Sequence, residues 1–125
     1  MQLRYVIVYV EDVPKATQFY ENAFGFAVRF VHESNMYAEM DSGQTLLAFA
    51  HNDMLKMNTG LEAQGGVKTG FELALTTDDV HAALHKAVNA GAKELAAPAE
   101  KPWGQTVAYV QDPFGAIIEI CTPMG

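Results

Sequence analysis

The fold of this chain is decided by the stretch Trp103-Gly104-Gln105-Thr106-Val107-Ala108-Tyr109-Val110-Gln111-Asp112-Pro113-Phe114-Gly115-Ala116-Ile117-Ile118-Glu119-Ile120. It predicts two short strands rich in Val, Ile and Tyr, joined by a turn whose Asp, Pro and Gly residues favour chain reversal. Glu119 lies between two isoleucines on a strand with no other charge. Because burying an ionised carboxylate is costly unless a partner compensates it, Glu119 is the first candidate functional residue.

The composition indicates one domain that interacts with neither nucleic acid nor membrane. The chain has 125 residues, half of them hydrophobic, which suits a single domain with a real core. A net charge of −7 argues against nucleic acid and anionic membranes as partners. We see no secretory leader and no apolar run of membrane length, and the single Cys121 cannot form an internal disulfide. These features predict a cytoplasmic protein.

The first module, residues 1–51, is predicted to have the element order β-α-β-β-β. Arg4–Val10 is apolar on both faces, as expected for a covered strand. A helix then begins after Asp12 and ends at Gly25. Three strand-like runs follow between residues 26 and 50, separated by short polar breaks.

The second module, residues 70–125, follows a linker over residues 52–69 that is polar, Gly-rich and without periodicity. Phe71–Thr76 reads as a strand whose odd-numbered residues bury beneath a helix that ends near Gly91. A short strand at Lys93–Leu95, a loop and the opening hairpin complete a second β-α-β-β-β module.

The two modules can be aligned by hand at their helix starts and their turns. Asp12-Val13 matches Asp79-Val80, and the residue seven places before each Asp is Tyr5 in the first copy and Glu72 in the second. Side chains alternate along a strand, so Tyr5 and Glu72 should point away from the helices.

A second pair of equivalent positions comes from the turns. Counting seven residues on from Asp41 and from Asp112 gives Ala48 opposite Glu119, whereas counting from the turn glycines gives Leu47. We therefore expect Tyr5, Ala48, Glu72 and Glu119 to face one shared concavity. Two carboxylates in a half-buried cavity must be bridged by a cation, be hydrogen-bonded, or share a proton with one pKa raised.

The order of these motifs resembles the glyoxalase, bleomycin-resistance and extradiol-dioxygenase superfamily, also called the vicinal oxygen chelate (VOC) superfamily. The resemblance covers nearly the whole chain. It rests on Tyr9-Val10-Glu11-Asp12-Val13 with Phe19-Tyr20 and Gly25-Phe26, on Thr77-Asp78-Asp79-Val80 with Gly91-Ala92, and on Asp112-Pro113-Phe114-Gly115 leading to Glu119. It implies an α+β fold, with two tandem βαβββ modules forming curved mixed sheets around a concave cavity. It also implies a homodimer, because a second chain usually completes or covers that cavity.

The metal enzymes of that family hold a divalent ion with His, Glu or Gln at the four inward positions, which here are Tyr5, Ala48, Glu72 and Glu119. A neutral phenol is a poor metal ligand beside imidazole or carboxylate, and alanine offers no donor. Stable catalytic sites normally have three protein ligands or more. The sequence therefore assigns no resident metal or cofactor, and leaves open a divalent ion such as Mg or Mn held by Glu72 and Glu119.

Aromatic residues complete the predicted pocket for a flat or cationic organic molecule. Tyr5, Tyr9 and Trp103 could form its walls, although core packing explains the two tyrosines equally well. Trp103 lies on a Pro- and Gly-containing loop and is the best candidate for the pocket edge. His51, three residues after Ala48, could reach the pocket rim or simply lie in a loop.

Three functional hypotheses follow. The first is a VOC protein that binds a small organic ligand in a dimer-associated cavity without a full catalytic metal site. The second is a divalent-metal-dependent lyase, isomerase or dioxygenase of the glyoxalase type that uses Glu72 and Glu119. The third is a metal-free catalyst in which one of these two carboxylates is a general base.

Overall fold

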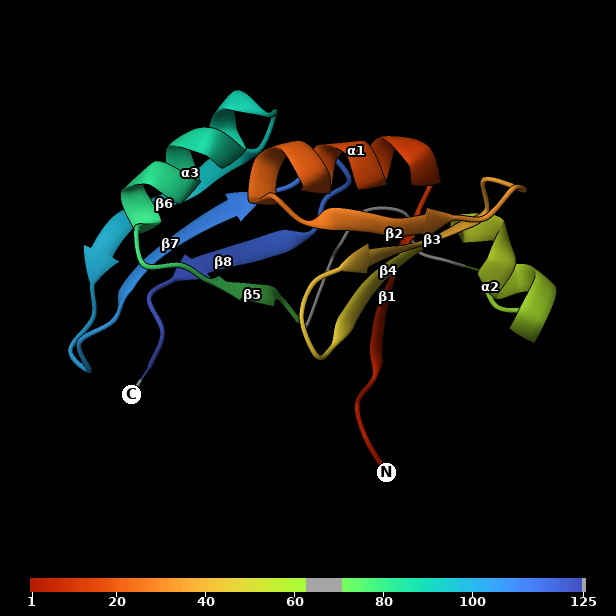
Figure 1. Cartoon of the computed structure of the whole chain (residues 1–125), viewed down its shortest axis with the longest axis horizontal. Coiled ribbons are helices and arrows are strands. Elements are labelled where there is room, and N and C mark those ends of the chain that lie inside the picture. Colours follow the sequence, from red (N-terminus) through yellow and green to blue (C-terminus); the bar gives the residue numbers. More distant parts are fainter. Residues whose placement is uncertain (63–70, 125) are drawn as a thin grey trace. The chain divides into compact units, whose positions relative to one another are not determined.

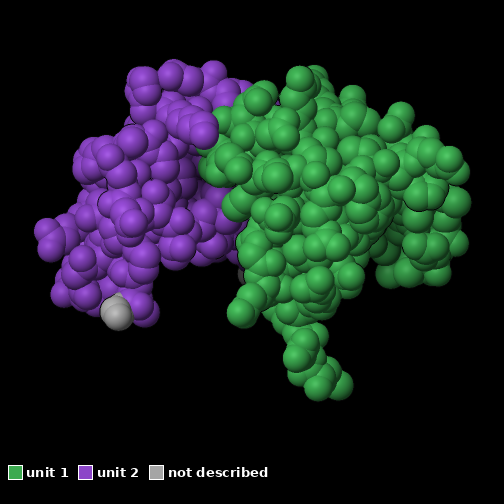
Figure 2. All heavy atoms as spheres, viewed as in Figure 1, with its two compact units in different colours: residues 1–65 green, residues 66–125 purple. Residues whose placement is uncertain are grey.

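The computed structural model describes residues 1–62 and 71–124. The chain divides into two compact units, residues 1–65 and residues 66–125, which Figure 2 shows in different colours. Each unit has its own four-stranded sheet and its own long helix, so each is described by itself.

Unit 1 has the element order β-α-β-β-β followed by one further helix. Its sheet has the strand order β1-β4-β3-β2, in which β1 is parallel to β4 and the other neighbours are antiparallel. The elements are β1 (Tyr5–Val10), α1 (Val13–Phe24), β2 (Ala27–Val31), β3 (Tyr37–Asp41), β4 (Leu46–His51) and α2 (Asn52–Thr59).

Unit 2 repeats this plan. Its sheet has the order β5-β8-β7-β6, with β5 parallel to β8 and the other pairs antiparallel (Figure 1). The elements are β5 (Leu73–Thr76), α3 (Val80–Asn89), β6 (Lys93–Glu100), β7 (Thr106–Gln111) and β8 (Ile117–Cys121). The predicted α+β fold of two tandem βαβββ modules is therefore confirmed.

Helix α1 begins at a side-chain cap and ends at a glycine. Asp12 accepts a hydrogen bond from the backbone N–H of Lys15, and Gly25 adopts the left-handed conformation with φ of 76°. The ring of Tyr20, which is fully buried, lies 4.8 Å from that of Phe49 on β4. Since Phe49 faces α1, its neighbour Ala48 faces the other way.

Helix α3 is built in the same manner. Its cap Asp79 accepts a hydrogen bond from the N–H of Ala82, and its buried side consists of Val80, Leu84 and Ala87. Helices α1 and α3 each cover one face of their own sheet. We call the opposite face of each sheet its helix-free face, and the candidate site residues within strands, Tyr5, Tyr9, Ala48 and Glu119, lie there.

Helix α2 lies within residues 52–69, the predicted linker, where the sequence predicted no helix. Its cap is His51, whose Nδ1 accepts from the N–H of Asp53, and Gly60 ends it with φ of 79°. No α2 residue is buried, so the segment lacks the apolar periodicity by which a helix is found in a sequence. Residues 63–69 of the predicted linker lie outside the described residues.

Two strand predictions in unit 2 also need correction. Strand β5 begins at Leu73, and Phe71, which was expected beneath the helix, is 56% exposed because it precedes the paired segment. Strand β6 extends to Glu100, well beyond the predicted Leu95. Its proline is tolerated since β6 is an edge strand whose pairing with β7 is interrupted by register shifts.

The turn between β7 and β8 is fixed by a buried carboxylate. Asp112 Oδ1 accepts hydrogen bonds from the N–H groups of Phe114 and Ala116, both at 2.8 Å. Asp112 is only 4% exposed, so these bonds are shielded from water. None of the helices in the described part of the chain has the length and apolarity needed to cross a membrane.

Candidate functional site

The strand pairings identify the equivalent positions of the two units. In the parallel pair β1–β4, Ile7 is the partner of Ala48, and in β5–β8, Ala74 is the partner of Glu119. Two residues before Ile7 and Ala74 stand Tyr5 and Glu72. Ala48, not Leu47, is therefore the counterpart of Glu119, and Tyr5 is the counterpart of Glu72.

Glu72 and Glu119 come together on the helix-free face of unit 2. Glu72 lies just before β5, and Glu119 lies in the middle of β8, the strand beside it. The pKa of Glu72 is raised above its ordinary value, first by partial burial, then by the negative charge of Glu119 and by a hydrogen bond between the two carboxyl groups. The sequence predicted that these two carboxylates face the same side, and the hydrogen bond between them agrees with this part of the prediction. That Tyr5 and Ala48 share one concavity with the pair stays a prediction.

Tyr109 is a third residue of this cluster, and sequence analysis missed it. It is the antiparallel partner of Glu119 across β7 and β8, and its hydroxyl donates to Glu119 Oε1 at 3.4 Å. Burial, and then the charges of Glu119 and Glu72, raise the pKa of Tyr109. Counting back across the hairpin from Glu119 through the Asp112 turn would have found this residue.

Cys121 lies two residues after Glu119 and therefore on the same face of β8. It is buried, and its thiol donates to the carbonyl oxygen of Leu75 at 3.7 Å. Burial and the nearby charges of Glu119 and Glu72 raise the pKa of this thiol. The thiol thus stays protonated, as expected for a small buried hydrophobe.

In unit 1 the equivalent positions carry no carboxylate, as the sequence indicates. Ala48 is fully buried, whereas the ring of Tyr5 is exposed and lies 5.7 Å from the guanidinium of Arg4. Tyr9 is half-buried on the same face of β1. Tyr5, Tyr9 and Ala48 thus share the helix-free face of unit 1.

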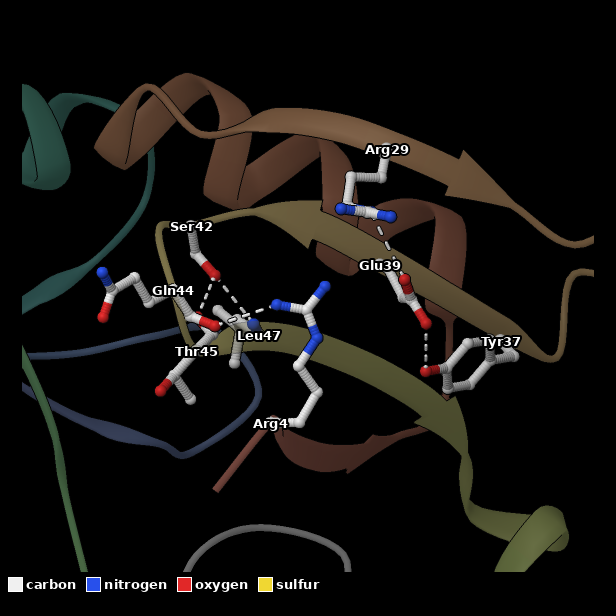
Figure 3. A network of polar contacts seen from close by, with 8 residues as sticks. All are labelled: Arg4, Arg29, Tyr37, Glu39, Ser42, Gln44, Thr45 and Leu47. Atoms are coloured by element: carbon white, nitrogen blue, oxygen red, sulfur yellow. Dashed lines mark hydrogen bonds and ion pairs between the residues drawn. The ribbon is translucent and has the colours of Figure 1, made fainter. Parts of the chain in front are cut away.

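A buried acid on that face was not predicted. Glu39 is the partner of Ala48 across β3 and β4, is 8% exposed, and therefore also faces away from α1. Figure 3 shows its carboxylate between Arg29 and Tyr37: Arg29 Nε lies 3.4 Å from Oε1, and the Tyr37 hydroxyl donates to Oε2 at 2.8 Å. Burial first, then the hydrogen bond and the charge of Glu39, strongly raise the pKa of Tyr37.

A second polar network in Figure 3 holds the turn between β3 and β4. The hydroxyl of Ser42 donates to the carbonyl of Thr45 and accepts from the N–H of Leu47. Arg4 Nη1 donates to the carbonyl of Gln44 at 3.1 Å. These groups border an open polar hollow of about 590 Å³ lined by Gln2, Leu3, Arg4, Gln44 and Thr45.

Trp103 and His51 have contacts outside these clusters. Trp103 is 61% exposed, and its Nε1 donates to Oε1 of Gln105 at 2.7 Å. His51, which was considered as a rim residue, instead caps α2 and lies 3.5 Å from the carboxylate of Asp53. The assignment of Trp103 to a pocket edge therefore stays a prediction.

The donor set does not fit a catalytic metal centre of the usual kind. The two carboxylates of Glu72 and Glu119 fall short of the three protein ligands that such centres normally have. Within residues 1–62 and 71–124, no group of three or more His, Cys, Asp or Glu residues is arranged to hold a metal ion. Tyr5 and Ala48 offer nothing better at the equivalent positions of unit 1.

Known proteins share this architecture. The chain of YraH from Bacillus subtilis (strain 168) is 26% identical over 124 residues, which cover 96% of this chain and 97% of YraH. The crystal structure of a glyoxalase/bleomycin resistance protein/dioxygenase family enzyme from Burkholderia phytofirmans PsJN matches with a TM-score of 0.85 and 23% identity, covering 99% of this chain and all (100%) of that one.

A glyoxalase-related enzyme from Fulvimarina pelagi matches with a TM-score of 0.86 and 23% identity over 100% of this chain and 93% of that one. At such identities these two structures establish the fold alone. The sequence model of the Glyoxalase/Bleomycin resistance protein/Dioxygenase superfamily matches residues 2–120, nearly the whole chain. This chain therefore belongs to the glyoxalase/bleomycin resistance protein/dioxygenase superfamily.

Proposed function

We propose that this protein binds a small organic molecule carrying a protonated amine, and that it does so without a complete protein-supplied metal site. The observation that supports the proposal is the contact between Glu72 and Glu119, in which partial burial and then the charge of Glu119 raise the pKa of Glu72. An ammonium group between the two carboxylates would relieve this repulsion and stabilise both in their charged forms.

The surroundings of the pair suit such a ligand. The phenol of Tyr109 already donates to Glu119 and so orients its carboxylate. Phe71, next to Glu72 in the sequence, exposes more than half of its side chain and offers apolar surface to the organic part of the ligand. Trp103 would take a place at the edge of the pocket, as its exposed ring on a loop suggests.

The proposal includes a cytoplasmic homodimer. Tyr5 and Ile7 on β1 each expose more than two fifths of their side chains, and both lie on the helix-free face of unit 1. Together with the half-buried Tyr9, and above the buried Ala48, they form a surface that a ligand or a second copy of the chain would cover. Sedimentation velocity would give the mass of the particle in solution.

The test uses benzylamine as the probe and benzyl alcohol as its neutral counterpart, titrated by calorimetry in a buffer containing EDTA. We expect benzylamine to bind more tightly, and its affinity to fall about tenfold in Glu72→Gln and in Glu119→Gln, because a charge-assisted hydrogen bond contributes about 1.5–3 kcal/mol. Glu94→Gln on β6, an exposed glutamate, is the matched control.

Equal binding of the amine and the alcohol, or equal affinity in all three variants, would contradict the proposal. Binding that is lost in EDTA and restored by Mg²⁺ or Mn²⁺ would instead support the metal-dependent lyase, isomerase or dioxygenase.

A metal-free catalyst is the second candidate, and the raised pKa of Glu72 favours it, since a general base works best with a pKa near the pH of operation. Proton exchange at an activated carbon of a bound substrate, lost in Glu72→Gln while binding persists, would support this reading.

A further inference from the structure

Strand β2 contains a β-bulge whose extra residue is Arg29. Val28 pairs with Met40 and Phe30 pairs with Glu39, so Arg29 and Phe30 both lie opposite the single residue Glu39. Bulges of this kind redirect a side chain and are common beside functional sites. Here the bulge brings a cation and an aromatic ring to the same position on the helix-free face of unit 1.

The guanidinium of Arg29 is held in place by Glu39. The carboxylate of Glu39, whose side chain is 10% exposed, pairs with Arg29 Nε and accepts from the Tyr37 hydroxyl. The Arg29 side chain, in contrast, is 44% exposed. A ligand approaching this face would therefore meet the outer edge of the guanidinium and not the carboxylate, whose oxygens are engaged (Figure 3).

An aromatic surface lies beside the guanidinium. The rings of Phe30 and Tyr37 have their centroids 6.0 Å apart and are tilted by 48°. Phe30 is 43% exposed, so one side of this pair is open to a further ring. Aromatic pairs of this geometry attract one another beyond the effect of the area that they bury.

We propose that Arg29, Phe30, Tyr37 and Glu39 form a binding site for an aromatic carboxylate. The ligand's ring packs on Phe30, and its carboxylate accepts hydrogen bonds from the outer edge of the Arg29 guanidinium, the bidentate geometry that arginine favours. Glu39 and Tyr37 are positioning residues, since they hold Arg29 without touching the ligand. The site lies within unit 1 and does not depend on the Glu72 and Glu119 pair.

The test compares 2-naphthoate with its neutral counterpart 2-naphthamide, each titrated by NMR into the full chain labelled with ¹⁵N. We expect naphthoate to bind about tenfold more tightly or better, and to shift the Arg29 Nε–H signal. In Arg29→Gln the ratio of the affinities for naphthoate and naphthamide falls to about one. Arg29→Lys retains only part of the preference for naphthoate, because a lysine cannot form the bidentate contact.

A separate measurement tests whether Glu39 positions the guanidinium of Arg29. In Glu39→Gln the Arg29 Nε–H signal moves or broadens before any ligand is added, and the preference for naphthoate decreases although the net charge of the cluster has become more positive. A purely electrostatic role predicts the opposite, tighter binding of the anion.

Two outcomes would overturn the proposal. One is an unchanged preference for naphthoate in both Arg29 variants, provided that their circular dichroism spectra match that of the parent chain. The other is equal affinity for naphthoate and naphthamide in the parent. Glu72→Gln separates this site from the proposed amine site, because it should weaken benzylamine binding and leave naphthoate binding unchanged.

Discussion

Glu39 on β3 is the direct cross-strand partner of Ala48 on β4, and both face away from α1. Ala48 is the counterpart of Glu119 in the other unit, where the acid lies on the inner strand β8 and its cross-strand partner is Tyr109. Both units thus have a carboxylate that accepts from a tyrosine hydroxyl, but it comes from β3 in unit 1 and from β8 in unit 2.

This relationship predicts the cost of moving the carboxylate in unit 1. Ala48→Glu would bury a second acid beside Glu39 and should lower the free energy of unfolding by about 3–5 kcal/mol, the range for an uncompensated buried charge. In the double variant Ala48→Glu/Glu39→Ala the two carboxylates no longer repel each other. The decrease in its free energy of unfolding should therefore be at least about 1 kcal/mol smaller than the sum of the decreases in the two single variants.

Urea unfolding at pH 7 measures these differences. Ala48→Gln is the control, since it adds nearly the same volume without charge. Strict additivity of the two single changes would show that the carboxylates do not interact.

Glu72 predicts a pH-dependent stability. Its folded pKa lies above the ordinary value of 4.5, so the folded state binds this proton more tightly than the unfolded state does. Stability is therefore lost as the pH rises from about the ordinary value of 4.5 through the folded pKa. Glu72→Gln should be more stable than the parent at pH 7 to 8 by at most about 1 kcal/mol, since an exposed charge is screened.

That gain should disappear as the pH falls below the ordinary glutamate pKa of 4.5, where Glu72 of the parent becomes neutral in the folded and in the unfolded state. Unfolding by urea at a series of pH values measures it, with Glu94→Gln as the matched surface change. A gain that does not vary with pH would show that the repulsion between the carboxylates is not its cause.

The two helix caps should contribute equally. Asp12 and Asp79 each accept one backbone N–H at 3.0 Å, so Asp12→Ala and Asp79→Ala should each cost about 1 kcal/mol. Hydrogen exchange resolves the effects, because faster exchange should appear in α1 for the first variant and in α3 for the second. Glu11→Ala, next to the first cap, should change neither helix.

The Asp112 turn should be more sensitive than its counterpart in unit 1. Asp112→Ala removes the shared acceptor of two backbone N–H groups in a buried place and should cost about 2–3 kcal/mol. Asp41→Ala should cost less than about 0.5 kcal/mol, because Asp41 is exposed and the serine hydroxyl beside it makes the turn's bonds. Thermal unfolding of the two variants side by side is the measurement.

Much of the fold could be predicted because the repeat is marked by residues with strong local roles. Asp12 and Asp79 cap helices, and Asp41 and Asp112 mark turns, so their positions in the sequence fix the strands between them. The contact between Glu72 and Glu119 followed from counting along those strands. It did not depend on any long-range information beyond the internal alignment.

The features that sequence analysis did not predict are those that no local sequence pattern indicates. Helix α2 has no buried face, so no apolar periodicity indicates it in the sequence. Tyr109 and Glu39 could not be identified from neighbouring residues, because their relevant partners lie on adjacent strands. Glu39 in particular follows two residues that are typical of an ordinary strand. Its charge is paired with Arg29 across a bulge that no sequence pattern indicates.

The extra residue in β2 has a consequence for how this chain tolerates insertions and deletions. Val28 pairs with Met40 and Phe30 pairs with Glu39, so removing Arg29 would make Val28 and Phe30 direct neighbours opposite two direct neighbours of β3. A missing codon at this place would thus straighten the strand and keep Val28 and Ala27 on their present faces, because successive side chains of a regular strand point to opposite sides. The deletion would remove the guanidinium and leave the pairing of β2 with β3 intact, whereas the loss of a residue from a regularly paired strand shifts the register on one side of the gap.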